Sequence, residues 1–171
     1  DSIEDFFEKI FPTKKVNEIK LEKLELHVEQ NLEKLKKEKY PSKKKPYPTD
    51  YSINSDSRKF LYHLCRILKP KNVIETGVAY GISSSYILQA LEDNKIGKLY
   101  SIDSIFRPWQ TEEMIGSIIP KKLKKKWKLI IGKSTEKLEN ISNEVKDLDI
   151  FIHDSSHTYE NMMFEFNIII K

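Results

Sequence analysis

Apolar side chains recur at every third or fourth position in the first part of the chain, which is typical of one face of an α-helix. The residues with this spacing are Leu21, Leu24, Val28, Leu32 and Leu35. A shorter helix is expected before them, since Ser2 and Asp5 have the spacing of a capping box. The apolar stripe has to be buried. Packing on the rest of the protein, a dimer contact and a lid over a ligand are all open alternatives.

A short segment rich in proline and lysine follows this helical appendage, which covers residues 1–40. Residues 41–48 contain three prolines and three lysines. Proline fixes its own φ and biases the preceding residue away from helix. The pattern therefore predicts an extended connector over residues 41–51, with the main domain over residues 52–171.

From residue 52 onward, short apolar runs alternate with amphipathic stretches. A helix is expected from about residue 54 until Pro70 stops it. The predicted strands are residues 72–75, 98–102, 127–131 and 149–152. The later helices are predicted over residues 82–91, after a cap at Ser134 or Thr135, and from about Thr158. Residues 104–126 form an insert with one short helix around residues 112–118.

Strands that alternate with helices predict a parallel sheet with right-handed crossovers, and hence an α/β doubly wound fold. The chain stops at Lys171 directly after three isoleucines of the last predicted helix. The fourth strand would then lie at a sheet edge although its composition is that of a buried strand. We expect more sheet to follow Lys171.

Composition and charge narrow the function classes. With 39% hydrophobic and 33% charged residues, the chain is typical of soluble globular proteins, and no run approaches the length of a membrane span. The single cysteine excludes an internal disulfide, which favours the cytoplasm. The net charge is +4, from lysines that cluster at residues 34–39, 43–45 and 121–126. With only three arginines present, solvated helix faces are favoured over a nucleic-acid surface.

A glycine-containing turn follows the first strand, with the sequence Glu75-Thr76-Gly77-Val78-Ala79-Tyr80-Gly81. Such turns let the backbone approach a ligand and point helix N–H groups at it. The dinucleotide fingerprint fails, because alanine and isoleucine occupy its second and third glycine positions. A phosphate-binding P-loop fails at residues 132–134, because Trp127 stands where its first glycine belongs.

This turn resembles the Glu-x-Gly-x-Gly-x-Gly signature of class I S-adenosylmethionine-dependent methyltransferases, with Ala79 at the middle glycine. The resemblance implies a Rossmann-like sheet with strand order 3-2-1-4 and a cofactor site that includes residues 75–77 and 79–81. By the same resemblance, Glu75 orders the turn or meets the cofactor's ammonium group. An ordinary strand-to-helix turn with a capping glutamate is the alternative.

Further cofactor contacts are expected after the second and third strands. Asp103 ends the second strand, where a carboxylate can accept hydrogen bonds from both ribose hydroxyls. By resemblance, residues 132–134 lie at the adenine edge, and Gly132 and Ser134 are the expected contacts. Ser134 is explained equally well as a helix N-cap. Phe106 and Trp109 are candidates for stacking on adenine or lining the acceptor pocket, with core packing as the alternative.

The segment Ile152-His153-Asp154-Ser155-Ser156-His157-Thr158-Tyr159 resembles that of small-molecule O-methyltransferases. The resemblance implies Asp154 as a Mg²⁺ ligand, with further ligands beyond Lys171, and His157 suits a general base. The alternatives are a helix N-cap for Asp154 and a core position for His153. A closed zinc site is disfavoured by two histidines four apart with a distant Cys65.

The function that these motifs predict is S-adenosylmethionine-dependent methyl transfer to an oxygen of a small molecule. A cofactor-binding module without activity and an RNA methyltransferase are the alternatives, whereas the glycine spacing disfavours a nicotinamide oxidoreductase. Expected partners are a small-molecule acceptor, no membrane, no nucleic acid, and a second copy of the chain through its N-terminal helices.

Overall fold

The structure, a computed structural model, describes residues 3–10, 19–50 and 52–171. Its sheet has four parallel strands in the order β3-β2-β1-β4. The strands are β1 (Asn72–Thr76), β2 (Lys98–Asp103), β3 (Trp127–Ile131) and β4 (Ile150–His153). The predicted α/β doubly wound class and the strand order are therefore confirmed. Each strand lies within two residues of its predicted bounds.

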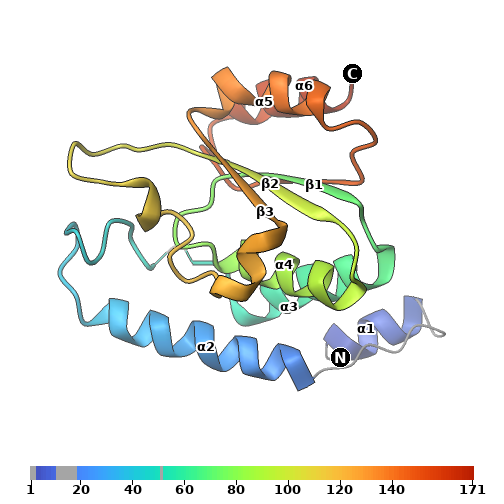
Figure 1. Cartoon of the computed structure of the whole chain (residues 1–171), viewed down its shortest axis with the longest axis horizontal. Coiled ribbons are helices and arrows are strands. Elements are labelled where there is room, and N and C mark those ends of the chain that lie inside the picture. The colour runs from blue at the N-terminus through green and yellow to red at the C-terminus, as the bar shows by residue number, and fades with distance from the viewer. Residues whose placement is uncertain (1–2, 11–18, 51) are drawn as a thin grey trace.

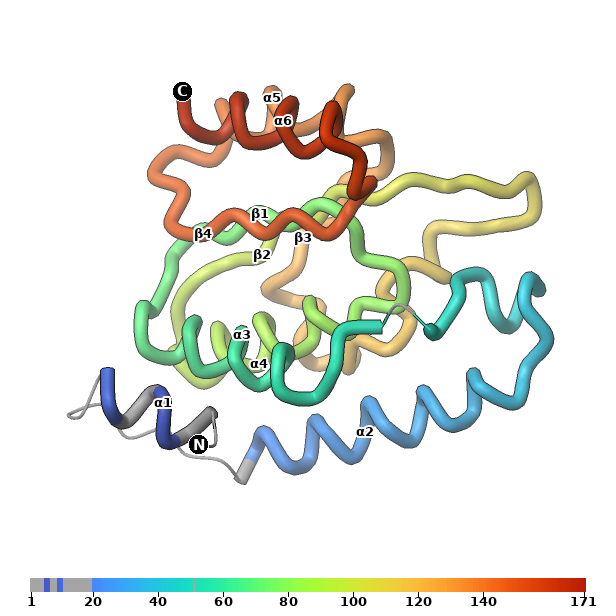
Figure 2. Tube along the Cα trace, turned by 180° about the vertical axis from the view of Figure 1, so that it is seen from behind, coloured from blue at the N-terminus to red at the C-terminus, as the bar shows by residue number. Residues whose placement is uncertain are grey.

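Helices cover both faces of the sheet, as Figures 1 and 2 show. On one face lie α5 (Ser134–Glu144) and α6 (Tyr159–Ile169), and on the other lie α3 (Ser55–Leu68) and α4 (Ile82–Asn94). The long helix α2 (Ile19–Lys36) forms a further layer outside α3 and α4, beside the short α1 (Ile3–Ile10). The α-helices are thus arranged in three layers around one sheet.

Alternation along the strands divides the core between the two faces. Successive side chains of a strand point to opposite faces. In β1, Val73 belongs to the apolar cluster with α3 and α4, whereas Ile74 belongs to the cluster with α5 and α6. Leu99 and Ile102 of β2 divide in the same way. The central strands are therefore buried on both faces, as expected for a parallel sheet.

The apolar stripe of α2 packs on the main domain. Leu21, Leu24, Val28 and Leu32 are buried in the same cluster as the inner side chains of α3 and α4. Lys20 also forms an ion pair with Asp93 at the end of α4. Of the three alternatives for this stripe, packing within the chain is the one that the structure contains.

The sheet register brings four loops to one edge. Thr76 at the end of β1 pairs with Ile102 of β2 and with His153 of β4. Asp103 in turn pairs with Ile131 at the end of β3. Since the strands are parallel, the segments that follow them all emerge at this carboxyl edge. Ligands of open α/β sheets bind at such an edge.

The insert between β2 and β3 differs from its prediction. In place of one helix over residues 112–118, the chain forms two 3₁₀ helices, η1 (Glu112–Met114) and η2 (Lys121–Lys126). The first ends where Ile115 becomes extended, and the next residue, Gly116, has a positive φ and donates its N–H to the Ala79 carbonyl in the glycine turn. Tertiary hydrogen bonds thus outweigh the local helical pattern.

The starts of the last two helices differ in how well they were predicted. Helix α6 begins next to Thr158, near its predicted start, and Thr158 caps it by accepting a hydrogen bond from the Asn161 N–H. Lys133 occupies the cap position of α5 without any side-chain bond, so the assignment of Ser134 or Thr135 as that cap was wrong. The Ser134 hydroxyl lies 3.4 Å from the Asn161 amide oxygen instead. The capping box at Ser2 lies outside the described residues.

The connector has neither helix nor strand in its described residues, but it is anchored to the main domain. Tyr47 is buried there, and its ring packs edge-on against Tyr80 with 5.2 Å between centroids. The Tyr80 hydroxyl donates to the Tyr47 carbonyl at 2.8 Å. This contact holds the connector against the glycine turn at the carboxyl edge of the sheet.

Replacing Leu24 with alanine is expected to lower the free energy of unfolding by about 2–5 kcal/mol, because the side chain is 4% exposed in the core. Leu26 on the same helix is 60% exposed, so Leu26→Ala is a matched control with an expected change below about 0.5 kcal/mol. Urea unfolding followed by circular dichroism measures both. Equal effects of the two variants would contradict the packing of α2 on the domain.

Candidate functional site

The turn after β1 has an unusual backbone. Gly77, Ala79 and Gly81 all have positive φ, at 83°, 47° and 78°. A Cβ at Gly77 would collide with the carbonyl oxygen of Asp154, so glycine is needed there for space as well as conformation. Ala79 adopts the left-handed region although it is not glycine, at a cost of about 1 kcal/mol. The surrounding structure has to hold this turn in place.

Asp103 supplies part of that support. Its Oδ2 accepts the N–H groups of Val78 at 3.0 Å and Ala79 at 2.8 Å, and its Oδ1 accepts the N–H of Ser104 at 2.6 Å. Burial raises the pKa of this carboxyl, and the three hydrogen bonds oppose the rise. The carboxylate therefore joins the end of β2 to the strained turn. Oδ2 thereby uses both of its lone pairs, and Oδ1 keeps one for a further donor.

Glu75 lies behind the turn and is fully buried. It accepts hydrogen bonds from the hydroxyls of Ser83 at 2.7 Å, Ser84 at 2.6 Å and Ser101 at 2.9 Å. Burial raises its pKa to about 7, against the lowering effect of the three serines. Since Ser83 and Ser84 begin α4, this geometry suits ordering of the turn rather than contact with a ligand.

A second carboxylate network holds the loop after β4. Glu165 of α6 is fully buried and accepts hydrogen bonds from the hydroxyls of Thr76 and Ser155, each at 2.7 Å. The Asn161 amide adds a bond at 3.0 Å, and His153 Nδ1 lies 2.6 Å away. Burial opposes ionisation, but these bonds outweigh it and lower the pKa of Glu165. His153 is thereby held in the core, its Nε2 without a hydrogen-bond partner.

Asp154 and His157 lie beyond this network, nearer to solvent. His157 Nε2 is 3.5 Å from Asp154 Oδ1, and both side chains are more than half exposed. Burial of part of the carboxyl raises the pKa of Asp154, while His157 and His153 oppose the rise. Thr158 is the N-cap of α6, so the alternative role of Asp154 as that cap was wrong. The geometry leaves the carboxylate and the imidazole available to a ligand.

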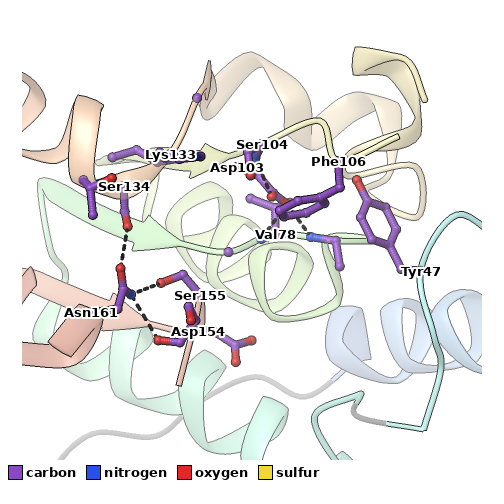
Figure 3. A pocket seen from close by; sticks show the side chains of 16 residues that line it. Tyr47, Val78, Asp103, Ser104, Phe106, Lys133, Ser134, Asp154, Ser155 and Asn161 are labelled. Atoms are coloured by element: carbon purple, nitrogen blue, oxygen red, sulfur yellow. Dashed lines mark hydrogen bonds between the residues drawn. The ribbon is translucent and has the colours of Figure 1, made fainter. Parts of the chain in front are cut away.

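These loops surround a cavity of about 480 Å³, shown in Figure 3. It lies at the carboxyl edge of the sheet, between the glycine turn, the ends of β2 and β3, and the loop after β4. Its lining residues are Tyr47, Gly77, Val78, Ala79, Ile102, Asp103, Ser104, Phe106, Gly132, Lys133, Ser134, Thr135, Asp154, Ser155, Ser156 and Asn161.

The predicted site residues divide around this cavity. Those that line it are Gly77, Ala79, Asp103, Gly132, Ser134 and Asp154. Those that support the glycine turn without lining it are Glu75, Thr76, Tyr80 and Gly81. Tyr47 and Asn161 were missed, because nothing in their local sequence marks a connector residue or a helix residue as part of this edge. Phe106 lines the cavity, whereas Trp109 does not.

A second cavity of about 320 Å³ adjoins the first. The residues common to both are Tyr47, Val78, Ala79, Asp154 and Ser155. His157 lines only the second, together with residues of the connector and of α4. The two predicted chemical groups, Asp154 and His157, therefore meet at the border between two adjoining spaces.

The charges around the first cavity suit a positively charged ligand that carries hydroxyl groups. Asp103 and Asp154 are its carboxylates, and Lys133 is its single basic side chain. Glu75 adds a third carboxyl behind the turn, close enough to Asp154 for the two to repel each other. A pyrophosphate would meet this negative wall, whereas a cation with a ribose would find acceptors. The residues thus fit a cationic nucleoside.

For the predicted Mg²⁺ site, the described residues offer only one candidate ligand, Asp154. The described residues contain no group of three His, Cys, Asp or Glu side chains able to hold an ion together. Asp154 is the acidic residue at the border of the cavities. Among the same residues, no helix is long and apolar enough to span a bilayer.

Fold and site together define a Rossmann-like domain with a cavity at the carboxyl ends of its strands. The methyltransferase-domain family model matches residues 74–171, which is more than half of the chain. The chain therefore belongs to this methyltransferase family, as the glycine turn predicted. No curated protein matches the chain.

Solved structures with the same fold share little sequence with this chain. The O-methyltransferase from Bacillus cereus, in complex with SAH, has a TM-score of 0.60 at 17% identity, over 97% of this chain and 67% of that one. The O-methyltransferase TomG from Streptomyces achromogenes, in complex with SAM, gives 0.56 at 16%, over 97% and 66%. SAH-bound Podospora anserina methyltransferase PaMTH1 gives 0.55 at 16%, over 92% and 65%. The chain thus spans about two thirds of each.

The pH dependence of stability is expected to report on Glu75. Its folded pKa of about 7 exceeds the ordinary value of 4.5, so the folded chain binds this proton more tightly than the unfolded chain. The resulting stability is complete below pH 4.5 and is lost as the pH rises through 7. The loss amounts to about 3 kcal/mol. Glu75→Gln should remove it, as measured by urea unfolding across this range. A variant with the slope of the original chain would contradict the assignment.

Proposed function

We propose that this chain binds S-adenosylmethionine in the first cavity and transfers its methyl group to an oxygen of a small molecule. The observation that carries the proposal is the placement of two carboxylates, Asp103 and Asp154, on opposite sides of the strained glycine turn. The neighbours of known structure that carry SAM or SAH support the choice of cofactor. When bound, the cofactor supplies a methyl group on a positively charged sulfur.

Each part of the cavity suits one part of that cofactor. The remaining lone pair of Asp103 Oδ1 would accept a hydrogen bond from a ribose hydroxyl, which would contribute about 1.5–3 kcal/mol. Gly77 lines the cavity with its backbone, and its missing side chain lets the loop after β4 pack directly on the turn. Gly132 and Ser134 line the side where adenine is expected, and Phe106 offers a ring to stack on it. The negative wall offsets the positive charge of the whole cofactor.

The chain's contribution to chemistry would be positioning and proton removal. His157, 3.5 Å from Asp154, would accept the proton of the acceptor hydroxyl as general base. Asp154 would orient that imidazole and stabilise the imidazolium that forms. Glu165 would keep the loop in place through its bonds to Ser155 and Asn161. For transfer, the acceptor oxygen must also lie in line with the methyl group, which depends on how the protein positions the acceptor and the cofactor.

A magnesium ion remains part of the proposal. Asp154 would be one ligand and would place the ion at the border of the two cavities, where it would lower the pKa of a bound hydroxyl. Carboxylate oxygen is the donor that this ion prefers, so the residue fits the metal.

Two other functions remain as candidates. A module that binds the cofactor without catalysis would use the same first cavity. Only the absence of methyl transfer in an assay would distinguish it from an active methyltransferase. An RNA methyltransferase would use the lysine clusters, but each cluster has a lysine paired with a glutamate of the chain itself: Lys36 with Glu33, Lys44 with Glu38 and Lys125 with Glu92. These contacts favour a small-molecule acceptor.

The proposal also covers the cellular location of the protein and its assembly. Cys65 is buried, and burial raises the pKa of its thiol to about 12, which suits a reduced residue in the cytoplasm. A homo-oligomer through the N-terminal helices would use exposed apolar residues such as Ile10 of α1 and Leu26 of α2, since the apolar stripe of α2 is already covered.

Calorimetric titration of S-adenosylhomocysteine into the chain tests the cofactor assignment. Saturable binding at micromolar affinity is expected, and Asp103→Asn should weaken it by about tenfold to a hundredfold, because hydrogen bonds to a charged acceptor are lost. Asp147→Asn, an exposed carboxyl in the turn before β4, is the matched control and should leave the affinity unchanged. Binding of NAD without binding of S-adenosylhomocysteine would overturn the proposal.

Replacement of the general base separates chemistry from binding. His157→Ala should reduce methyl transfer to phenolic acceptors about a hundredfold or more, with the affinity for S-adenosylhomocysteine unchanged. Release of S-adenosylhomocysteine from S-adenosylmethionine is the readout. Transfer that proceeds unchanged in this variant would exclude His157 as the base, and absence of transfer in the original chain would favour the binding module.

A further inference from the structure

The second cavity has a wall chemistry that selects among acceptors. Its apolar lining includes Pro48, Ile53, Val78 and Ile82. Its polar lining comprises Asp154 and His157 together with the serines Ser52, Ser83 and Ser155. No lysine or arginine is among the described residues that line this space. A ligand there would keep its hydroxyl near His157 and place the rest of its body against the apolar residues.

Charge decides which molecules this space admits. A phosphate or carboxylate on the acceptor would lose its hydration and find no cation to pair with, which is strongly unfavourable. The Asp154 carboxylate adds repulsion, and Asp103 and Glu75 are close enough to interact electrostatically with it. A metal ion at Asp154 would remove the repulsion from that carboxylate, but an anionic group at the end of the acceptor away from the hydroxyl would still meet no basic side chain. Neutral and cationic acceptors meet neither penalty.

Tyr47 closes the border between the two cavities. It is 7% exposed and lines both spaces, as Figure 3 shows for the first. Its hydroxyl accepts a hydrogen bond from the Gln110 amide at 2.5 Å, and its backbone is held by Tyr80. Because the side chain is held by the Gln110 bond and by the edge-on Tyr80 ring, it does not turn aside easily for a larger ligand. The ring therefore limits the length of what occupies the second cavity.

We propose that the second cavity takes a compact, apolar, hydroxyl-bearing acceptor without an anionic group, and that Tyr47 determines the upper limit of its size. This inference rests on the proposed function, and it adds the class of acceptor and a specificity-determining residue. At about 320 Å³ the space is at the lower end of small-molecule sites. Coenzyme A esters, nucleotides and RNA fall outside this class.

Three phenols of equal ring size test the charge selectivity: 4-ethylphenol, tyramine and 4-hydroxyphenylacetate. Their binding to the chain saturated with S-adenosylhomocysteine is measured by ligand-observed NMR, with EDTA present and again with Mg²⁺. The neutral and cationic phenols should bind at least about tenfold more tightly than the anionic one. Asp154→Asn should reduce this ratio without reversing it, since the apolar residues remain.

Variants at Tyr47 test the size limit. With 4-phenylphenol as the larger probe, Tyr47→Ala should increase binding about tenfold relative to 4-ethylphenol. Tyr47→Phe, which keeps the ring and loses only the Gln110 bond, should keep the original preference. Retained S-adenosylhomocysteine binding shows that each variant is folded. If the alanine variant fails to bind it, Tyr47→Leu, which shortens the side chain and keeps the core apolar, takes its place.

The outcomes separate this inference from the proposed function. If S-adenosylhomocysteine binds but the anionic phenol binds as tightly as the others, or none of the phenols binds, the assignment of the second cavity is overturned and the methyltransferase proposal stands. An unchanged size preference when Tyr47 is shortened overturns its role alone. If S-adenosylhomocysteine fails to bind the original folded chain, the cofactor assignment fails and the acceptor inference fails with it.

Discussion

The hydrogen bonds from the Val78 and Ala79 N–H groups to the Asp103 carboxylate connect the parts of this structure on which the site depends. They hold a left-handed turn that contains a non-glycine residue, and they join two neighbouring strands at their carboxyl ends. A backbone in this conformation is stable only where its surroundings determine it. The same carboxylate is buried beside the larger cavity. Support of the turn and recognition of a ligand are thus combined in one side chain.

Two other buried carboxylates also hold loops in place at the carboxyl edge of the sheet. Glu75 binds the serines at the start of α4, and Glu165 binds residues from β1, β4 and α6. Each is surrounded by hydroxyl, amide or imidazole groups that replace water. A buried carboxylate without such partners would be strongly destabilising. Their opposite pKa shifts follow from this balance: burial dominates at Glu75, and hydrogen bonds dominate at Glu165.

The N-terminal part of the chain contributes to both the core and the site. Helix α2 covers α3 and α4 with its apolar stripe, and the connector then returns to the carboxyl edge, where Tyr47 lies between the two cavities. A segment outside the α/β alternation thereby forms a wall of the candidate acceptor space. Variation in such a segment can change specificity while the cofactor site stays as it is.

The sequence by itself determined the α/β alternation, the strand positions, the strand order by family resemblance, and the residues after each strand that meet at one edge. These features follow from local periodicity and from the geometry of parallel sheets. Only the tertiary structure decided which residues face the ligand. Glu75 lies behind the turn, and Gly116 of the insert bonds to Ala79 where a helix was expected. Tyr47 and Asn161 come to the cavity from segments without a motif. Such contacts join residues far apart in the chain, and local patterns do not record them.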